Sequence, residues 1–186
     1  DVGWVDVHEE TLERTLPAAG PAIVVPAFLS AGHHVTHDIP TAIERTHGRA
    51  RTTSHVGPDL DPALRDRLTE LGPLGDGVVL APAGSNHERA NRGTRATAER
   101  LSALLGRPVE VGFFHSAHPS PAEALARLRT AGAEDVSVAT NVLLPGLSQK
   151  RIAALGLPTT RPIGVHEALI EAIVRRHLAA LPHRPY

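Results

Sequence analysis

The chain has 186 residues, of which 41% are hydrophobic and 21% are charged, and its formal net charge is -1. This composition is typical of a globular protein with one ordinary domain or two small ones, and the near-neutral charge argues against nucleic-acid binding. No apolar stretch approaches the roughly 20 residues of a membrane span, and the absence of cysteine excludes disulfides and thiolate metal ligands. We therefore expect a cytoplasmic protein without a membrane or nucleic-acid partner.

Short apolar runs alternate with segments of helical periodicity along the whole chain. Strands are predicted over residues 2–7, 22–28, 51–56, 77–83, 108–114, 135–143 and 159–163. Helices are predicted over residues 10–19, 39–47, 62–71, 87–105, 121–132, 147–155 and 165–180. This alternation predicts an α/β fold with parallel sheet.

Two of the predicted helices carry start signals. Asp38 is predicted to cap the helix over 39–47, with Pro40 in the first turn. The segment 120–123 reads Ser-Pro-Ala-Glu, which is a capping box with proline at the first helical position.

An internal repeat divides the chain. Residues 3–20 resemble residues 112–132, and residues 22–34 resemble residues 136–148. The repeat predicts two similar α/β units, residues 1–75 and residues 76–186. The second unit opens with a strand that has no counterpart in the first. The first unit is therefore expected to lack its N-terminal βα element, and a preceding segment or another chain is expected to complete its sheet.

Four segments resemble, in the same order, the motifs of the sirohydrochlorin chelatases, which are class II tetrapyrrole chelatases. Residues 24–40, VVPAFLSAGHHVTHDIP, resemble an apolar strand followed by F-L-x-x-G-x-H and then D-[IL]-P. The other three are GWVDVHEETL, VLAPAGSNHERAN and VLLPGLSQKRI. The resemblance implies two flavodoxin-like halves facing each other across a cleft. It also implies insertion of Co²⁺ or Fe²⁺ into sirohydrochlorin, in cobalamin or siroheme biosynthesis, without an organic cofactor.

The resemblance also assigns the metal site. His34 matches the histidine of G-x-H, and Asp6 matches the acidic residue of the strand over 2–7, although many members have glutamate there. Both are expected to be catalytic and to bind the metal. Imidazole binds Fe²⁺ and Co²⁺ and can accept the pyrrole protons, whereas a carboxylate compensates charge. The carboxyl ends of parallel strands would gather both residues at one rim of the sheet.

Further residues are expected to line the substrate cleft: Ser30, Gly32, His33, Ser85 and His115. The second unit has Ala83 and Ser148 where the motifs have histidine, so one metal site is expected, in the first unit.

The remaining histidines have less specific interpretations. His37 is either part of a metal relay or a surface residue near the start of a helix. Surface positions are expected for His47, His55, His166, His177 and His183.

Two other functions stay open. A non-catalytic metal or tetrapyrrole carrier of the same fold would bind its ligand and never release a metallated product. A purely structural flavodoxin-like module would leave the histidine cluster unexplained. The sequence does not distinguish cobalt from iron, because both suit nitrogen and oxygen ligands.

Overall fold

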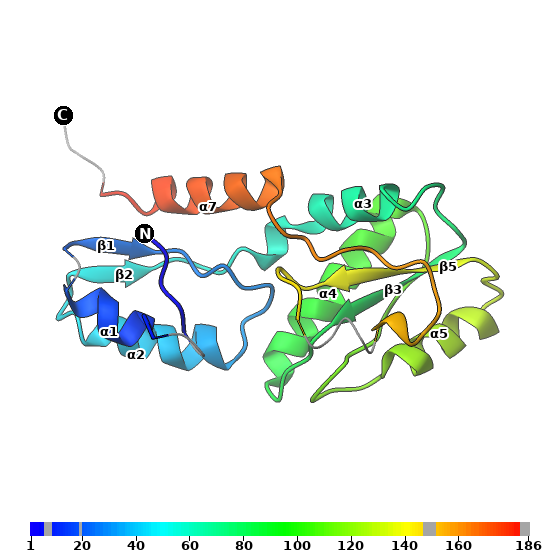
Figure 1. The fold of residues 1–186 in the computed structure, drawn as a ribbon, viewed down its shortest axis with the longest axis horizontal. Coiled ribbons are helices and arrows are strands. Elements are labelled where there is room, and N and C mark those ends of the chain that lie inside the picture. Colours follow the sequence, from blue (N-terminus) through cyan, green and yellow to red (C-terminus); the bar gives the residue numbers. More distant parts are fainter. Residues whose placement is uncertain (6–8, 19, 147–151, 183–186) are drawn as a thin grey trace.

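A computed structural model describes residues 1–5, 9–18, 20–146 and 152–182. The chain forms two halves, each built around a small parallel sheet (Figure 1). Within the described ranges, no helix combines the length and the apolar character needed to span a bilayer. The α/β class and the parallel pairing predicted from the sequence are confirmed.

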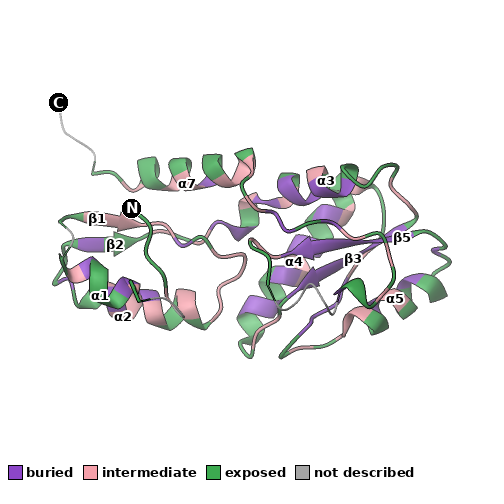
Figure 2. Ribbon diagram, in the orientation of Figure 1, coloured by how far each residue is buried: buried purple, intermediate pink, exposed green. Residues whose placement is uncertain are grey.

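The second half contains a three-stranded sheet with the order β4-β3-β5. These strands are β3 (Gly77–Pro82), β4 (Val109–Val111) and β5 (Val136–Asn141). Every residue of β3 and β5 is buried (Figure 2). β3 reads as a continuous apolar run, because a strand covered on both faces has no solvated side, whereas β5 also buries Ser137, Thr140 and Asn141.

Two helices of the second half pack beside this sheet, α4 (Glu88–Leu105) and α5 (Pro121–Thr130). The capping box predicted at the start of α5 is confirmed. The backbone N–H of Glu123 donates to Ser120 Oγ at 3.3 Å, and the backbone N–H of Ser120 donates to Glu123 Oε2 at 2.6 Å.

The first half contains a two-stranded parallel sheet, β1 (Ala22–Val24) beside β2 (Ala50–Thr52). Its helical segments are α1 (Leu12–Thr15), η1 (Leu16–Ala18), η2 (His34–Asp38) and α2 (Ile39–Glu44). Five buried residues form its small core: Leu12, Leu16, Ile39, Ala42 and Ala50. All of β1 is only partly buried, in contrast to β3 and β5 (Figure 2).

Two helices connect the halves. After η3 (Gly57–Asp59), α3 (Asp61–Thr69) packs against α4 and β5 of the second half. The last helix, α7 (Glu167–Ala179), runs back along the first half (Figure 1). There Arg175 and Arg176 both pair with Asp59. The chain therefore crosses between the halves twice, and these crossings help to fix the position of one half relative to the other.

Two predicted strands are wrong within the described residues. Of the strand predicted over 2–7, residues 2–5 show a single bridge, between Trp4 and Thr11. In the second half β4 pairs with β3, whereas the described part of the first half has no strand equivalent to β3.

The strand predicted over 159–163 is likewise reduced to one bridge, between Val138 and Thr159. Beyond that bridge the backbone N–H of Thr140 donates to the side chain of Thr160, at 2.8 Å from Oγ1, instead of to a backbone carbonyl of a neighbouring strand. Pro162 then lacks the N–H that a longer ladder would need.

The start of the helix predicted over 39–47 is also different. A π-helical turn, η2, precedes α2, and Asp38 has helical angles, with φ -65° and ψ -46°. Its carboxylate makes no capping bond to the backbone, so the interpretation of Asp38 as an N-cap is wrong. Most of the helix predicted over 147–155 lies outside the described residues.

Two histidines expected at the surface are instead partly buried structural residues. His55 Nδ1 lies 3.2 Å from the backbone carbonyl oxygen of Phe28, in the loop that follows β1. The side chain of His166 is only 14% exposed, and its Nδ1 accepts a hydrogen bond from the backbone N–H of Ala168 at the start of α7.

Candidate active site

A cavity of about 1610 Å³ is lined by residues of both halves. Its walls include residues 22–30 of the first half, residues 82–84 and 141–144 of the second, and part of α7. Three of these wall segments lie at the carboxyl ends of β1, β3 and β5, where parallel α/β proteins bind their ligands. The volume exceeds the roughly 300–1,000 Å³ of most small-molecule pockets. The cavity therefore has room for a large, largely apolar ligand.

The π-helical turn η2 begins where the loop after β1 ends. The backbone N–H groups of Val35 and Thr36 both donate to the carbonyl of Gly32, and Thr36 Oγ1 donates to the same carbonyl at 3.0 Å. The backbone N–H of Ile39 donates to the carbonyl of His34. Single π-helical turns are rare in proteins overall, and many of those that occur are at functional sites. Here the turn projects His33, His34, His37 and Asp38 from one short segment.

His34 is the member of this turn that lines the cavity. Its Nδ1 lies 2.6 Å from Asp38 Oδ2, and its ring lies 5.7 Å from the ring of Phe28. Since the carboxylate engages Nδ1, Nε2 is the ring nitrogen that would bind a metal. A carboxylate in this position orients a ligating imidazole and increases its basicity.

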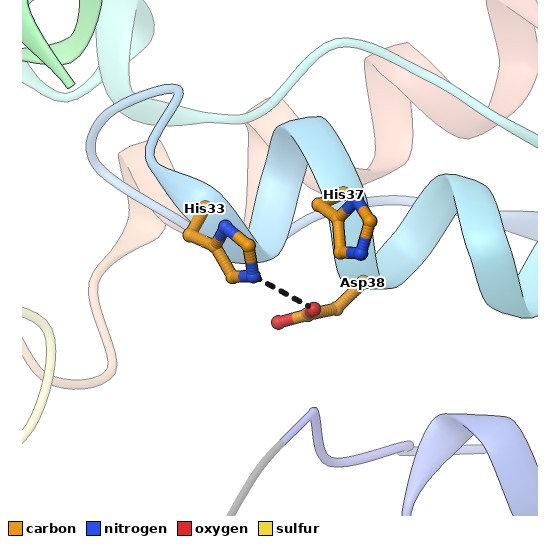
Figure 3. A group of neighbouring side chains, drawn as sticks. All are labelled: His33, His37 and Asp38. Carbon is orange, nitrogen blue, oxygen red and sulfur yellow. Dashed lines mark ion pairs between the residues drawn. The ribbon is translucent and has the colours of Figure 1, made fainter.

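A second group of side chains, which we call the outer cluster, comprises His33, His37 and Asp38 (Figure 3). One potential ligand atom of each residue lies within 4.8 Å of those of the other two. His33 Nε2 is 3.4 Å from Asp38 Oδ1, and the rings of His33 and His37 stack with centroids 4.9 Å apart. Both histidines are exposed, so this cluster is accessible from solvent.

The loop before η2 meets the second half at two points. A Cβ added to Gly32 would lie 3.6 Å from Ser85 Oγ, and the ring of His33 stacks on that of His87 with centroids 5.8 Å apart. The buried Asn91 holds the Ser85 segment, because its amide donates to the carbonyl of Ser85 at 2.7 Å and its Oδ1 accepts from the N–H of Ser85. Thus the second half contributes an ordered loop beside the histidines.

The segment that leads into η3 packs closely against the loop after β1 and holds it in place. The backbone N–H of Val56 donates to the carbonyl of Pro26, and that of Gly57 donates to the carbonyl of Phe28. A Cβ on Gly57 would overlap the carbonyl of Leu29, so only glycine fits. Burial lowers the pKa of the neighbouring His55, although the hydrogen bond to Phe28 opposes this effect.

The structure places the residues expected at the site as follows. His34 and Ser30 line the cavity, while Gly32 and Ser85 meet where the halves touch. His33 belongs to the outer cluster. His115 is exposed, and its backbone N–H donates to the carbonyl of Ala83, which lines the cavity.

Two expected positions, Asp6 and Ser148, lie outside the described residues. The role of Asp38 was not predicted from the sequence, although its spacing of four residues from His34 is the spacing of facing side chains on a helix. Asn91 gave no sequence signal, because its partner is the backbone of another segment.

Comparison with known proteins covers almost the whole chain. Residues 2–71 and 77–180 match the sequence profile of the CbiX family. Similar solved structures include SirB from Bacillus subtilis with Fe³⁺, with a TM-score of 0.80 and 21% identity over 96% of this chain and 80% of that one. A search among curated proteins gave no match.

Two further structures share the fold. The sirohydrochlorin chelatase SirB from Bacillus subtilis subspecies spizizenii in complex with cobalt has a TM-score of 0.74 and 19% identity over 95% of this chain and 78% of that one. CbiX, described as the terminal enzyme for biosynthesis of siroheme in denitrifying bacteria, has a TM-score of 0.61 and 18% identity over 90% and 79%. These similarities confirm the predicted fold.

Proposed function

Because the chain belongs to the CbiX family, the sirohydrochlorin chelatase family whose motifs it carries, we propose that it inserts a divalent metal into a tetrapyrrole. The metal is Co²⁺ or Fe²⁺, and the substrate is sirohydrochlorin. The observation that carries this proposal is His34, oriented by Asp38 on the wall of a large cavity. The two SirB structures with Fe³⁺ and with cobalt support the choice of metals.

Metal insertion needs two things from the protein. Two pyrrole N–H protons must leave as the dication enters, so the net charge of the macrocycle does not change. The cation must also lose its water shell at the macrocycle. An imidazole at the cavity wall can hold the metal through Nε2 in its neutral form and can accept a proton once the metal has moved on. His34 occupies that position and would take one of the two pyrrole protons, with Asp38 stabilising the resulting imidazolium, and the other proton would pass to solvent water.

The apolar walls would bind the macrocycle. Residues 22–29 present mostly aliphatic side chains to the cavity, and α7 adds Leu169, Ile173 and Val174. Burial of an extended apolar ring against such surfaces is favourable by roughly 25 cal/mol per Å². Polar contacts at the rim, from Ser30 and Ser85, would recognise the carboxylates of the substrate.

The proposal assigns the metal chemistry to the first half. In the second half, Ala83 lines the cavity where the motif has a histidine, and alanine offers no ligand. Asp6 is proposed as the second metal ligand, and the preceding residues Trp4 and Val5 line the same cavity. The second half then contributes to substrate binding through Ser85 and His115.

The test is a turnover assay under anaerobic conditions. The purified chain is incubated with sirohydrochlorin and either Co²⁺ or Fe²⁺, and the visible spectrum of the tetrapyrrole is followed. We expect metallated product in excess of the protein, formed faster than in the protein-free reaction. The variant His34→Ala should lose this activity, whereas His118→Ala, which changes a side chain that is 88% exposed, should keep it. Stoichiometric binding without product release would instead identify a carrier.

A further inference from the structure

We propose that the outer cluster, His33, His37 and Asp38, is a second metal-binding site, which takes the divalent cation from solvent and supplies it to His34. The binding site itself stands on geometry, and its supply role rests on the proposed function. The sequence predicted a single metal site in this half of the chain. The outer cluster adds another beside it.

The backbone of one helical turn presents the ligands. His33 and His37 are four residues apart and their rings stack, which places both imidazoles on the same face of the turn (Figure 3). Two histidines at this spacing on a helix form a common chelating pair. Asp38 follows directly, and its Oδ1 lies 3.4 Å from His33 Nε2. Ligands bound at about 2.0–2.1 Å in tetrahedral geometry lie at comparable separations from one another.

The ligand set suits the metals that the proposed reaction uses. Two imidazoles and one carboxylate leave coordination positions for water, as in the non-haem Fe²⁺ sites with two histidines and one carboxylate. Such a site binds Co²⁺ or Fe²⁺ and removes part of the water shell while remaining open to exchange. The exposure of His33 and His37 keeps the site accessible to metal in solution.

Asp38 connects the outer cluster to the cavity. Its Oδ1 faces His33 and its Oδ2 faces His34 Nδ1, so one carboxylate contacts both sites. His34 lines the cavity, whereas the cavity wall does not include His33, His37 or Asp38. Asp38 therefore stands between the outer cluster, which is outside the cavity, and His34, which lines it. A cation bound at the outer cluster would therefore be held by His33, which directly precedes His34 in the chain, and by Asp38, which contacts His34.

The first experiment titrates the protein with Co²⁺ alone, using the visible absorption of protein-bound cobalt and calorimetry. The wild-type protein should show two inequivalent sites. His37→Ala should weaken the outer site by more than the roughly 10- to 100-fold that is typical for losing a residue that only supports a metal ligand. His34→Ala should retain it, and His118→Ala serves as the matched exposed-histidine control. If His37→Ala binds cobalt at both sites as the wild type does, the outer site does not exist.

The second experiment measures insertion as a function of metal concentration. His37→Ala should insert more slowly than the wild type when Co²⁺ is limiting and should recover the wild-type rate at saturating Co²⁺. Equal rates at limiting metal would overturn the supply role. If the wild type inserts no metal, yet cobalt binding still depends on His37, the proposed function fails and the outer site stands. If the wild type inserts metal normally but His37→Ala does not change cobalt binding, the proposed function stands and the outer site fails.

Discussion

His34 Nδ1 and Asp38 Oδ2 lie 2.6 Å apart within one π-helical turn. The two residues are four apart in the sequence, and the π-helical turn places their side chains next to each other. The turn continues directly into α2. The carboxylate therefore holds the imidazole in one orientation beside the cavity. A residue that precedes Ile-Pro and resembles a helix cap instead acts on the side chain of a histidine.

The variant Asp38→Asn tests this positioning role. An amide keeps the size of the side chain but removes the negative charge that stabilises a protonated His34. We expect the rate of metal insertion at saturating metal to fall roughly 10- to 100-fold, while the KM for the tetrapyrrole stays the same. A matched control is Asp66→Asn, which changes a carboxylate paired with Arg65 on the surface. Wild-type kcat in Asp38→Asn would show that the pair has no functional role.

His34→Ala separates function from folding. The side chain of His34 is 41% exposed, so its removal should change the free energy of unfolding by less than about 1 kcal/mol. Metal insertion should nevertheless be abolished. Denaturant unfolding and the turnover assay measure the two effects on the same preparation. Strong destabilisation together with residual insertion would identify His34 as a structural residue.

Gly57→Ala tests whether the loop after β1 depends on a close backbone approach. The added methyl group would overlap the carbonyl of Leu29 and must push the loop away from η3. We expect a loss of about 1–3 kcal/mol in the free energy of unfolding, as for other overpacked sites, and a lower insertion rate. Gly93→Ala, within α4, is the control, because a Cβ there meets nothing within 4 Å. That change should stabilise the helix by about 0.5–1 kcal/mol.

His55 should make stability depend on pH. Burial lowers the pKa of His55 from its ordinary value of 6.5, so the unfolded chain binds a proton more readily than the folded protein does. Stability should therefore be fully present above pH 6.5 and should decrease as the pH falls below that value. Unfolding measured between mildly acidic and neutral pH should show a shallower pH dependence in His55→Gln. A slope in His55→Gln equal to that of the wild type would contradict this role of His55.

Arg67 should be a major determinant of how the last segment of the chain docks. Its side chain is 5% exposed, its Nε and Nη2 donate to the carbonyl of Ile163, and its Nη1 donates to Glu70. Arg67→Met leaves the carbonyl of Ile163 without these donors and should cost about 1–3 kcal/mol, while Glu70 keeps its pair with Arg161. Arg65→Met, which removes an exposed ion pair with Asp66, should cost less than about 1 kcal/mol. Equal stabilities of the two variants would contradict this role.

The sequence by itself determined the elements whose signals are local. The apolar run of β3, the capping box at Ser120 and the alternation of strands with helices depend on neighbouring residues, so periodicity and capping rules predict them. The motif around Gly32 and His34 is equally local, so the order of residues is enough to indicate the family. The strand over 159–163 failed because Thr160 satisfies the backbone through its side chain, a choice that depends on its partner Thr140.

The tertiary structure decided which of these residues meet. Gly32 and Ser85, like His33 and His87, are more than fifty positions apart, and their proximity depends on how the two halves pack. Asp38 has the local appearance of a helix cap. It becomes the partner of His34 because the π-helical turn η2 begins at His34, before the predicted start of the helix. Ile39, which follows Asp38, is buried in the small core of the first half. No short-range pattern encodes that packing, since its free energy comes from contacts between segments that are distant in the chain.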